Sequence, residues 1–255
     1  MELTISELAR ACSTSETSVV RFCREVGLTG YAQLKLLMAS ELGKEAAQFS
    51  NGADYGSDIR PGDTLEEAVA KVASSEIVGI QETAANLDMA ALRKIVETID
   101  NARTVLLYGV SASGAGAQDL QQKLLRIGKI ALTFRDSHDA LVSANLLNPG
   151  DVAVAFSHGG TTKESVELLR AARHSGAKTV AISNVADSPV TAQADYTLLT
   201  AVRETTFRSG AMASRIAQLT VVDYIFVGVA QRSYENTVQA LRTTYDAVRV
   251  LRDDR

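Results

Sequence analysis

Residues 151 to 172 read DVAVAFSHGGTTKESVELLRAA. The apolar run Val152 to Phe156 predicts a buried strand, and the polar residues 157 to 162 predict a short loop after it. A helix is expected next, because apolar residues then recur every three positions (Val166, Leu169, Ala172). Thr161 and Glu164 fit a capping box, which predicts that this helix begins at Thr161.

This strand, loop and helix favour an anion site. The first turn of a helix has unpaired backbone N–H groups, and the positive end of its dipole points toward the preceding loop. Ser157, His158 and Thr162 are expected to lie beside that turn, so we predict that the loop binds a phosphate. Ser, Gly and Thr are also ordinary turn residues, so the loop alone is equally compatible with a turn that binds nothing.

The pattern of strand followed by helix repeats from residue 104 to residue 200. Five apolar runs are separated by helical or turn segments: TVLLYGV, KIALTF, VAVAF, TVAIS and YTLLT. This alternation predicts a parallel sheet covered by helices on both faces, with ligands bound beyond the carboxyl ends of the strands. The first run ends in a second loop of hydroxyls and glycines, residues 109 to 114, which contains Ser111 and Ser113. Two such loops strengthen the prediction of a ligand.

Neither loop has the spacing of a nucleotide-binding motif. The glycines of residues 109 to 114 do not form a dinucleotide fingerprint, and no Gly-Lys pair followed by Ser or Thr is present in either loop. The remaining candidate is a smaller phosphorylated molecule. Two cysteines without CxxC spacing give no metal site, and no cofactor is expected.

Composition and charge set further limits. Apolar residues make up 46% of the 255 residues, and the net charge is −4, which excludes general binding of nucleic acid over the whole surface but not a local contact patch. No apolar run reaches the roughly 18 residues that span a bilayer, and no secretory signal is visible at the start. We therefore expect a cytoplasmic protein that does not bind membranes.

The first 50 residues predict short helices. Thr4 and Glu7 form a capping box, Ser15 is placed to cap a second helix that ends near Gly27, and its buried stripe is expected at four positions (Val19, Phe22, Cys23, Val26). Its other face carries Thr17, Ser18, Arg21 and Arg24. Hydroxyls at a helix start with arginines further on suit DNA, as in a helix-turn-helix. Five basic against six acidic residues in this segment would by themselves favour a plain helical hairpin.

Residues 4 to 42 closely resemble the N-terminal helix-turn-helix of the RpiR-type bacterial transcriptional regulators. The resemblance rests on two sets of residues, first Ser15, Ser18, Val19, Arg21 and Phe22, then Gly27, Gly30, Tyr31 and Lys35. It implies that DNA is contacted by Ser15, Thr17, Ser18, Arg21, Arg24 and Lys35. Family members normally carry another helix ahead of this one, which is apparently absent here, and this leaves open whether the chain still binds DNA.

The two hydroxyl loops resemble those of the sugar isomerase (SIS) domain, where they hold a sugar phosphate. The resemblance implies a ligand site made by Ser111, Ser113, Ser157, His158, Gly159, Thr162 and Glu204. Within it Ser113, Ser157 and Thr162 are expected to bind phosphate, and Gly159 stands where the family usually has a second serine. Glu204 is either a sugar contact or, in related isomerases, the base, and it could also be an ordinary solvated acid. His158 either reaches the sugar ring or shapes the loop.

These observations predict an α/β protein in which a small all-α helix-turn-helix domain (1 to 50) and a linker (51 to 63) precede a parallel-sheet SIS domain (64 to 255). Residues 216 to 229 are apolar on all sides, and the last helix carries an apolar stripe, so we expect a homodimer or a higher homo-oligomer. The predicted function is a transcriptional regulator that binds operator DNA and a phosphorylated sugar. The alternatives are an aldose-ketose sugar phosphate isomerase and a dimer that only binds ligand.

Overall fold

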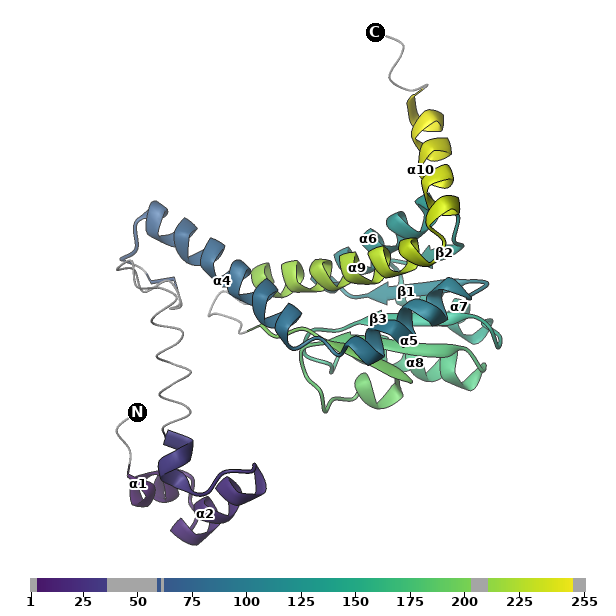
Figure 1. The fold of residues 1–255 in the computed structure, drawn as a ribbon. Helices are drawn as coiled ribbons and strands as arrows, with labels where there is room; N and C mark the ends of the chain where they lie inside the picture. The colour runs from purple at the N-terminus through teal and green to yellow at the C-terminus, as the bar shows by residue number, and fades with distance from the viewer. Residues whose placement is uncertain (1–3, 36–58, 61, 203–210, 250–255) are drawn as a thin grey trace. The chain divides into compact units, whose positions relative to one another are not determined.

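The computed structural model describes residues 4–35, 59–60, 62–202 and 211–249. The chain divides into two compact units, Met1–Tyr55 and Gly56–Arg255. Each unit is described by itself below, with the labels of Figure 1.

The first unit contains the two predicted short helices. Helix α1 (Ile5–Ala11) begins with the capping box of Thr4 and Glu7, and α2 (Glu16–Glu25) begins at Ser15, whose hydroxyl accepts a hydrogen bond from the N–H of Ser18. Helix α1 packs against α2. The predicted starts of both helices are therefore confirmed.

The core of this unit is smaller than the sequence predicts. Ala9, Val19 and Cys23 are buried, but Phe22 is 57% exposed and Val26 is 51% exposed. The prediction of a stripe through all four apolar positions of α2 was wrong for these two residues. The buried face of α2 includes the half-buried Val20 in place of Phe22. Val26 is the C-cap residue of α2, so it lies beyond the last helical turn that packs against α1.

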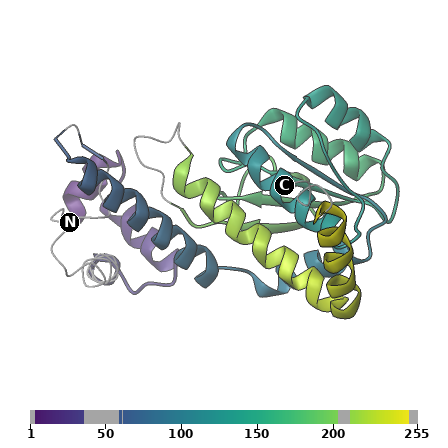
Figure 2. The ribbon, with the colours of Figure 1, turned by 90° about the horizontal axis from the view of Figure 1, so that it is seen from above.

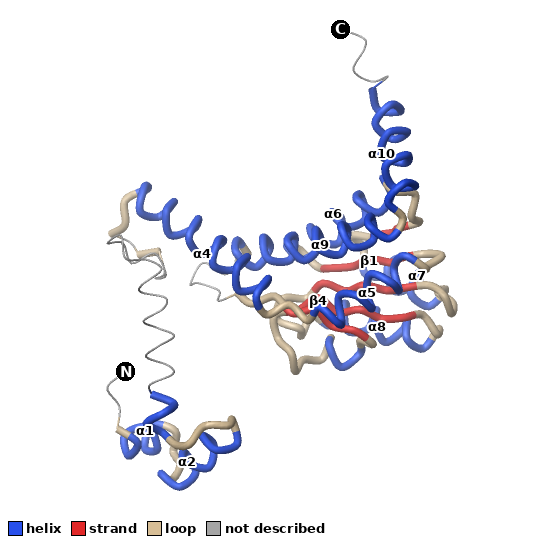
Figure 3. Tube along the Cα trace, viewed as in Figure 1, coloured by secondary structure: helices blue, strands red, loops and turns tan. Residues whose placement is uncertain are grey.

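The second unit is built on a sheet of strands, drawn in red in Figure 3. It is a parallel five-stranded sheet in the order β2-β1-β3-β4-β5. Its strands coincide with the five predicted apolar runs: β1 (Val105–Gly109), β2 (Ala131–Thr133), β3 (Val152–Phe156), β4 (Lys178–Ser183) and β5 (Tyr196–Leu199). All five residues of β3 are buried, as expected for a central strand covered on both faces. The strand order reverses between β1 and β3, and open α/β sheets bind ligands at such a point.

Helices cover both faces of the sheet, as predicted. One face packs against α5 (Met89–Asp100), α6 (Ala112–Arg126) and α9 (Met212–Arg232). The other packs against α7 (Ser137–Asn145) and α8 (Lys163–His174), and the short helix η1 (Thr191–Gln193) precedes β5. Side chains of β1 and β3 alternate between the two cores, with Leu107 and Val154 on the first face and Leu106 and Ala153 on the second.

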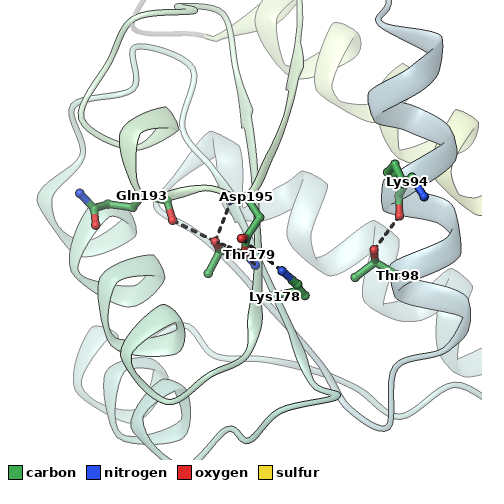
Figure 4. Close-up of polar contacts among 6 residues, drawn as sticks. All are labelled: Lys94, Thr98, Lys178, Thr179, Gln193 and Asp195. Atoms are coloured by element: carbon green, nitrogen blue, oxygen red, sulfur yellow. Dashed lines mark hydrogen bonds and ion pairs between the residues drawn. The ribbon is translucent and has the colours of Figure 1, made fainter.

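The amino ends of the strands are joined by buried polar contacts. Asp151, just before β3, accepts two hydrogen bonds from the guanidinium of Arg103, at 3.1 and 2.7 Å, and its side chain is 1% exposed. The side chain of Asp195 accepts from the N–H of Thr179 at 2.9 Å, and the N–H of Asp195 donates to the hydroxyl of Thr179 at 3.0 Å, which ties the start of β5 to the start of β4 (Figure 4). This edge therefore has a structural role, and the opposite edge is left for a ligand.

Two further helices extend the second unit. Helix α4 (Leu65–Ala85) packs along α9 (Figure 2), and the N–H of Ala201 donates to the buried hydroxyl of Thr83. Helix α9 is long and apolar enough to cross a membrane by length and composition, but it lies against α4, α5 and α6 as a core helix does. Helix α10 (Tyr234–Arg249) follows α9 and projects from the edge of the unit (Figure 1).

Candidate functional site

The two hydroxyl loops lie side by side at the carboxyl edge of the sheet. Strands β1 and β3 are hydrogen-bonded neighbours, and Gly109, the last residue of β1, is paired with Phe156, the last residue of β3. Ser111 and Ser157 follow these paired residues by two positions and one position. The loops predicted from the sequence are thus brought together by the register of the two central strands.

The loop after β1 is a tight turn under backbone strain. A Cβ atom on Gly109 would lie 2.6 Å from the carbonyl oxygen of Ser113, so this turn accepts only glycine. Ser111 has φ +54° and ψ −122°, a region that side chains rarely adopt and that costs about 1–3 kcal/mol. This conformation lets the chain pass directly from β1 into α6, so that Ser111 and Ser113 lie at the carboxyl edge of the sheet.

The loop after β3 presents two hydroxyls in contact. Ser157, which is 1% exposed, donates to the hydroxyl oxygen of Thr162 at 3.1 Å. Thr162 is the N-cap residue that directly precedes α8, one residue later than the Thr161 predicted from the sequence. The predicted capping box of Thr161 and Glu164 was wrong, because the helix start is at Thr162 and that hydroxyl meets Ser157 instead of capping.

Three helices begin at this edge, α6, α7 and α8, and two of them, α6 and α8, lack a capping side chain. Among the described helices, α1, α2, α4, α5 and α7 each begin with a side chain that accepts from a first-turn N–H. Neither Ser111 at the start of α6 nor Thr162 at the start of α8 makes such a bond. The N–H groups at the start of α8 therefore remain available to an anion, and the helix dipole favours one there.

A third loop, after β4, packs against the loop after β3 and holds it through hydrogen bonds. The carbonyl of His158 accepts from the N–H of Asn184 at 2.9 Å and from the hydroxyl of Ser183 at 3.3 Å. Gly160 has φ +71°, and a Cβ atom there would lie 2.2 Å from the hydroxyl of Ser188. The sequence analysis missed these residues, because contacts between separate loops leave no local pattern.

Helix α9 contributes a buried amide that the sequence analysis also missed. Gln218 is 2% exposed, and its Nε2 donates to the hydroxyl oxygen of Ser113 at 3.3 Å. The available signal was a glutamine on the mostly apolar buried side of this helix, where Ser214 is also buried.

The electrostatics of the edge also include carboxylates. Burial raises the pKa of the Tyr108 phenol, and the carboxylates Glu164 and Asp136 act in the same direction. This phenol therefore stays protonated at neutral pH.

The remaining predicted ligand residues are less fully placed. His158 and Gly159 are half-buried within the loop after β3. Glu204 lies outside the described residues. Within the described part of the chain, no group of three or more His, Cys, Asp or Glu side chains could hold a metal ion.

The predicted DNA-binding residues lie on or near α2. Thr17, Arg21 and Arg24 are exposed, whereas Ser18 is half-buried and its hydroxyl lies 3.0 Å from that of Ser15. Lys35 is half-buried. Hydrogen bonds from Thr4 lower the pKa of Glu7, and the charge of Lys35 adds to this effect.

A hollow of about 810 Å³ lies apart from the loops described above. Its walls come from α6, α9 and α10, and it is lined by Lys123, Arg126, Phe226, Val238, Leu241, Arg242, Tyr245 and Asp246. The apolar stripe of the last helix thus forms one wall of this hollow.

Two family models match the chain. Residues 1–45 match the helix-turn-helix domain of the rpiR family, and residues 98–228 match the SIS domain. An HTH-type transcriptional regulator of Caldanaerobacter subterraneus subsp. tengcongensis is 40% identical over 247 residues, which cover 97% of this chain and 86% of that protein. The HTH-type transcriptional regulator YbbH of Bacillus subtilis is 35% identical over 255 residues, which cover 99% of this chain and 87% of that protein.

Solved structures give the same result. The NanR protein of Vibrio vulnificus, solved in complex with ManNAc-6P, is 31% identical, with a TM-score of 0.69 over 97% of this chain and 86% of that one. The sugar isomerase domain of an RpiR transcription factor from Sphaerobacter thermophilus shares the fold at 23% identity, with a TM-score of 0.63 over 70% of this chain and 98% of that one. The chain belongs to the RpiR family of HTH-type transcriptional regulators, in which a helix-turn-helix domain is joined to a SIS domain.

Proposed function

We propose that this protein is a bacterial transcriptional regulator that binds operator DNA through its helix-turn-helix and a phosphorylated sugar at the carboxyl edge of its sheet. The observation that carries the proposal is the pairing of Gly109 with Phe156, which places two hydroxyl loops beside one uncapped helix start. We keep 1–50, 51–63 and 64–255 as the proposed DNA-binding domain, linker and effector domain. The protein acts in the cytoplasm, where its DNA is.

The chemistry of the edge supports a phosphate. A phosphate dianion accepts hydrogen bonds only, and the edge offers the hydroxyls of Ser111, Ser113, Ser157 and Thr162 together with the N–H groups at the start of α8. We assign the phosphate to Ser113, Ser157 and Thr162, and the sugar to Ser111, His158, Gly159 and Glu204. NanR is a related protein that was solved with ManNAc-6P, so amino sugar 6-phosphates are the first class to test.

The test measures both activities on the full chain. Calorimetric titration with N-acetylmannosamine 6-phosphate, glucosamine 6-phosphate, fructose 6-phosphate and ribose 5-phosphate should identify one tight binder, and the unphosphorylated sugar should bind far more weakly. Electrophoretic mobility with the DNA upstream of its own gene should show a complex whose affinity changes when that sugar phosphate is added. A coupling of about 1–3 kcal/mol would change DNA affinity about 5- to 150-fold. The proposal would be refuted if the affinity for DNA stayed the same in the presence of every sugar phosphate.

We infer that the protein does not isomerise the sugar it binds. A regulator needs only differential binding, and the DNA-binding domain has no use in an isomerase. The competing function, an aldose-ketose isomerase with Glu204 or His158 as base, is tested by mixing the protein with the tight binder and following the ketose product by NMR. Turnover above the rate without protein would overturn this inference.

We also propose that two copies associate through α10, which suits an operator with two half-sites. Apolar residues line one side of α10 at a spacing of three and four, and the outer ones are exposed, Tyr245 by 56% and Val248 by 50%. Arg242 and Asp246 flank the hollow one turn apart, so a two-fold axis between them sets each arginine against the other copy's aspartate. Sedimentation velocity should show a dimer for the wild type and a monomer for Tyr245→Asp. Asn236→Asp, at an exposed position on the side of α10 away from the apolar stripe, should remain dimeric.

A further inference from the structure

The buried amide of Gln218 needs an explanation, because an amide in an apolar environment is unfavourable unless it is hydrogen-bonded. Gln218 lies on α9, whose neighbours Ala217 and Val221 are fully buried in the core. Its Nε2 lies 3.3 Å from the hydroxyl oxygen of Ser113 in the first turn of α6. The amide thus makes its contact with a residue of the proposed phosphate site.

This contact determines what the hydroxyl of Ser113 can do. A serine hydroxyl has one proton to donate and two lone pairs that accept. When the N–H of Gln218 donates to one lone pair, the hydroxyl proton cannot point back at that amide nitrogen and is directed elsewhere. A phosphate dianion can only accept, so it requires this orientation of the hydroxyl.

Helix α9 packs closely against α6 at the position of Gln218. At Gly116 of α6 a Cβ atom would lie 3.1 Å from the ring of Phe156 and 3.8 Å from the Cβ of Gln218. The end of β3, the second turn of α6 and α9 therefore meet closely at this glycine. The Cβ of Gln218 is thus held close to α6, the helix that carries Ser113.

We propose that Gln218 is a positioning residue of the effector site, which holds the hydroxyl of Ser113 with its proton aimed at the phosphate of the bound sugar. The inference rests on the proposed function, because it requires Ser113 to bind phosphate. It adds a residue from α9 that acts on the ligand through Ser113 and not by touching it.

The test is a double-mutant cycle on the full chain, with inorganic phosphate and the tightest-binding sugar phosphate as probes. Gln218→Met keeps the length of the side chain without a donor, and it should weaken both probes about tenfold, which corresponds to about 1.4 kcal/mol. Gln218→Glu can only accept when ionised, so it draws the proton of Ser113 toward itself and should weaken binding about 100-fold. Binding of the unphosphorylated sugar should be unchanged in both variants.

The same substitutions are then made in the Ser113→Ala background. There Gln218→Met should change the dissociation constants less than twofold, because the residue it acts through is gone. Thr220→Val removes a hydroxyl from the same helix, where it bonds the carbonyl of Ile216, and it should leave binding unchanged. The melting temperature of each unliganded variant separates a loss of binding from a loss of folding, and Gln218→Glu replaces Gln218→Met if the latter does not fold.

The outcomes separate this inference from the function on which it rests. If Ser113→Ala binds both probes as tightly as the wild type, the assignment of Ser113 to phosphate is wrong and the role of Gln218 is lost with it. If Ser113→Ala binds more weakly but Gln218→Met has the same effect in both backgrounds, only the positioning role is refuted. Equal binding by Gln218→Glu and the wild type would also refute it, since an acceptor at that position would then suffice.

Discussion

Replacing Ser157 with alanine tests the proposed phosphate site most directly. The hydroxyl of Ser157 is buried and donates to Thr162 at 3.1 Å, so its loss removes one neutral hydrogen bond from the unliganded fold, worth about 1 kcal/mol. The melting temperature should fall by only about 2–4 °C. In the complex the one hydroxyl proton of Ser157 turns from Thr162 to the charged phosphate, and that hydrogen bond is worth about 1.5–3 kcal/mol. The net loss of binding free energy is therefore about 0.5–2 kcal/mol, and the dissociation constant should rise about 2- to 30-fold.

The matched control is a buried hydroxyl at the opposite edge of the sheet. Thr179 is fully buried at the start of β4, and its hydroxyl donates to the carbonyl of Gln193 at 2.9 Å (Figure 4). Thr179→Val should lower the melting temperature at least as much as Ser157→Ala but leave the dissociation constant unchanged. Calorimetric titration of both variants with the tightest-binding sugar phosphate decides the matter. Equal affinity of Ser157→Ala and the wild type would show that this loop does not hold the phosphate.

Three further predictions follow from other parts of the chain. Arg21→Ala should weaken DNA binding and reduce the slope of affinity against salt concentration by about one, as measured by fluorescence anisotropy; an unchanged slope would show that this face of α2 does not meet the phosphates. Gly160→Ala should lower the free energy of unfolding in urea by more than about 1 kcal/mol, because of the positive φ and the clash with Ser188. The hydrogen bonds and charge of Arg103 lower the pKa of Asp151, so this carboxylate stabilises the fold above about pH 4 and less as pH falls through its lowered pKa. The difference in unfolding free energy between wild type and Asp151→Asn should therefore shrink below about pH 4. A difference that stays constant with pH would contradict the lowered pKa of Asp151.

The sheet was predictable because its strands are short apolar runs bounded by polar loops. Val152 to Phe156 has the same bounds in the sequence prediction and in the structure, since every residue of that strand is buried. Parallel pairing then places the loops after β1 and β3 at one edge, which is why Ser111, Ser113, Ser157 and Thr162 could be grouped before the fold was known.

Other parts of the site depend on contacts that a local pattern does not contain. The start of α8 was misplaced because Thr161 and Glu164 satisfy the spacing of a capping box, whereas Thr162 is the N-cap residue and bonds to Ser157. Gln218 was missed because it acts across two helices, 105 residues away from Ser113 in the chain. The exposure of Phe22 could not be foreseen either, since helical spacing gives the direction of a stripe only to within one residue.

The uncapped start of α8 implies a compromise between stability and function. An aspartate in place of Thr162 would accept from the first-turn N–H groups and stabilise the helix, as Asp88 and Asp136 do for α5 and α7. The same carboxylate would place a permanent negative charge where the effector's phosphate is proposed to bind. Selection for a more heat-resistant protein would therefore readily find a substitution at this position, but the resulting regulator would no longer bind its effector.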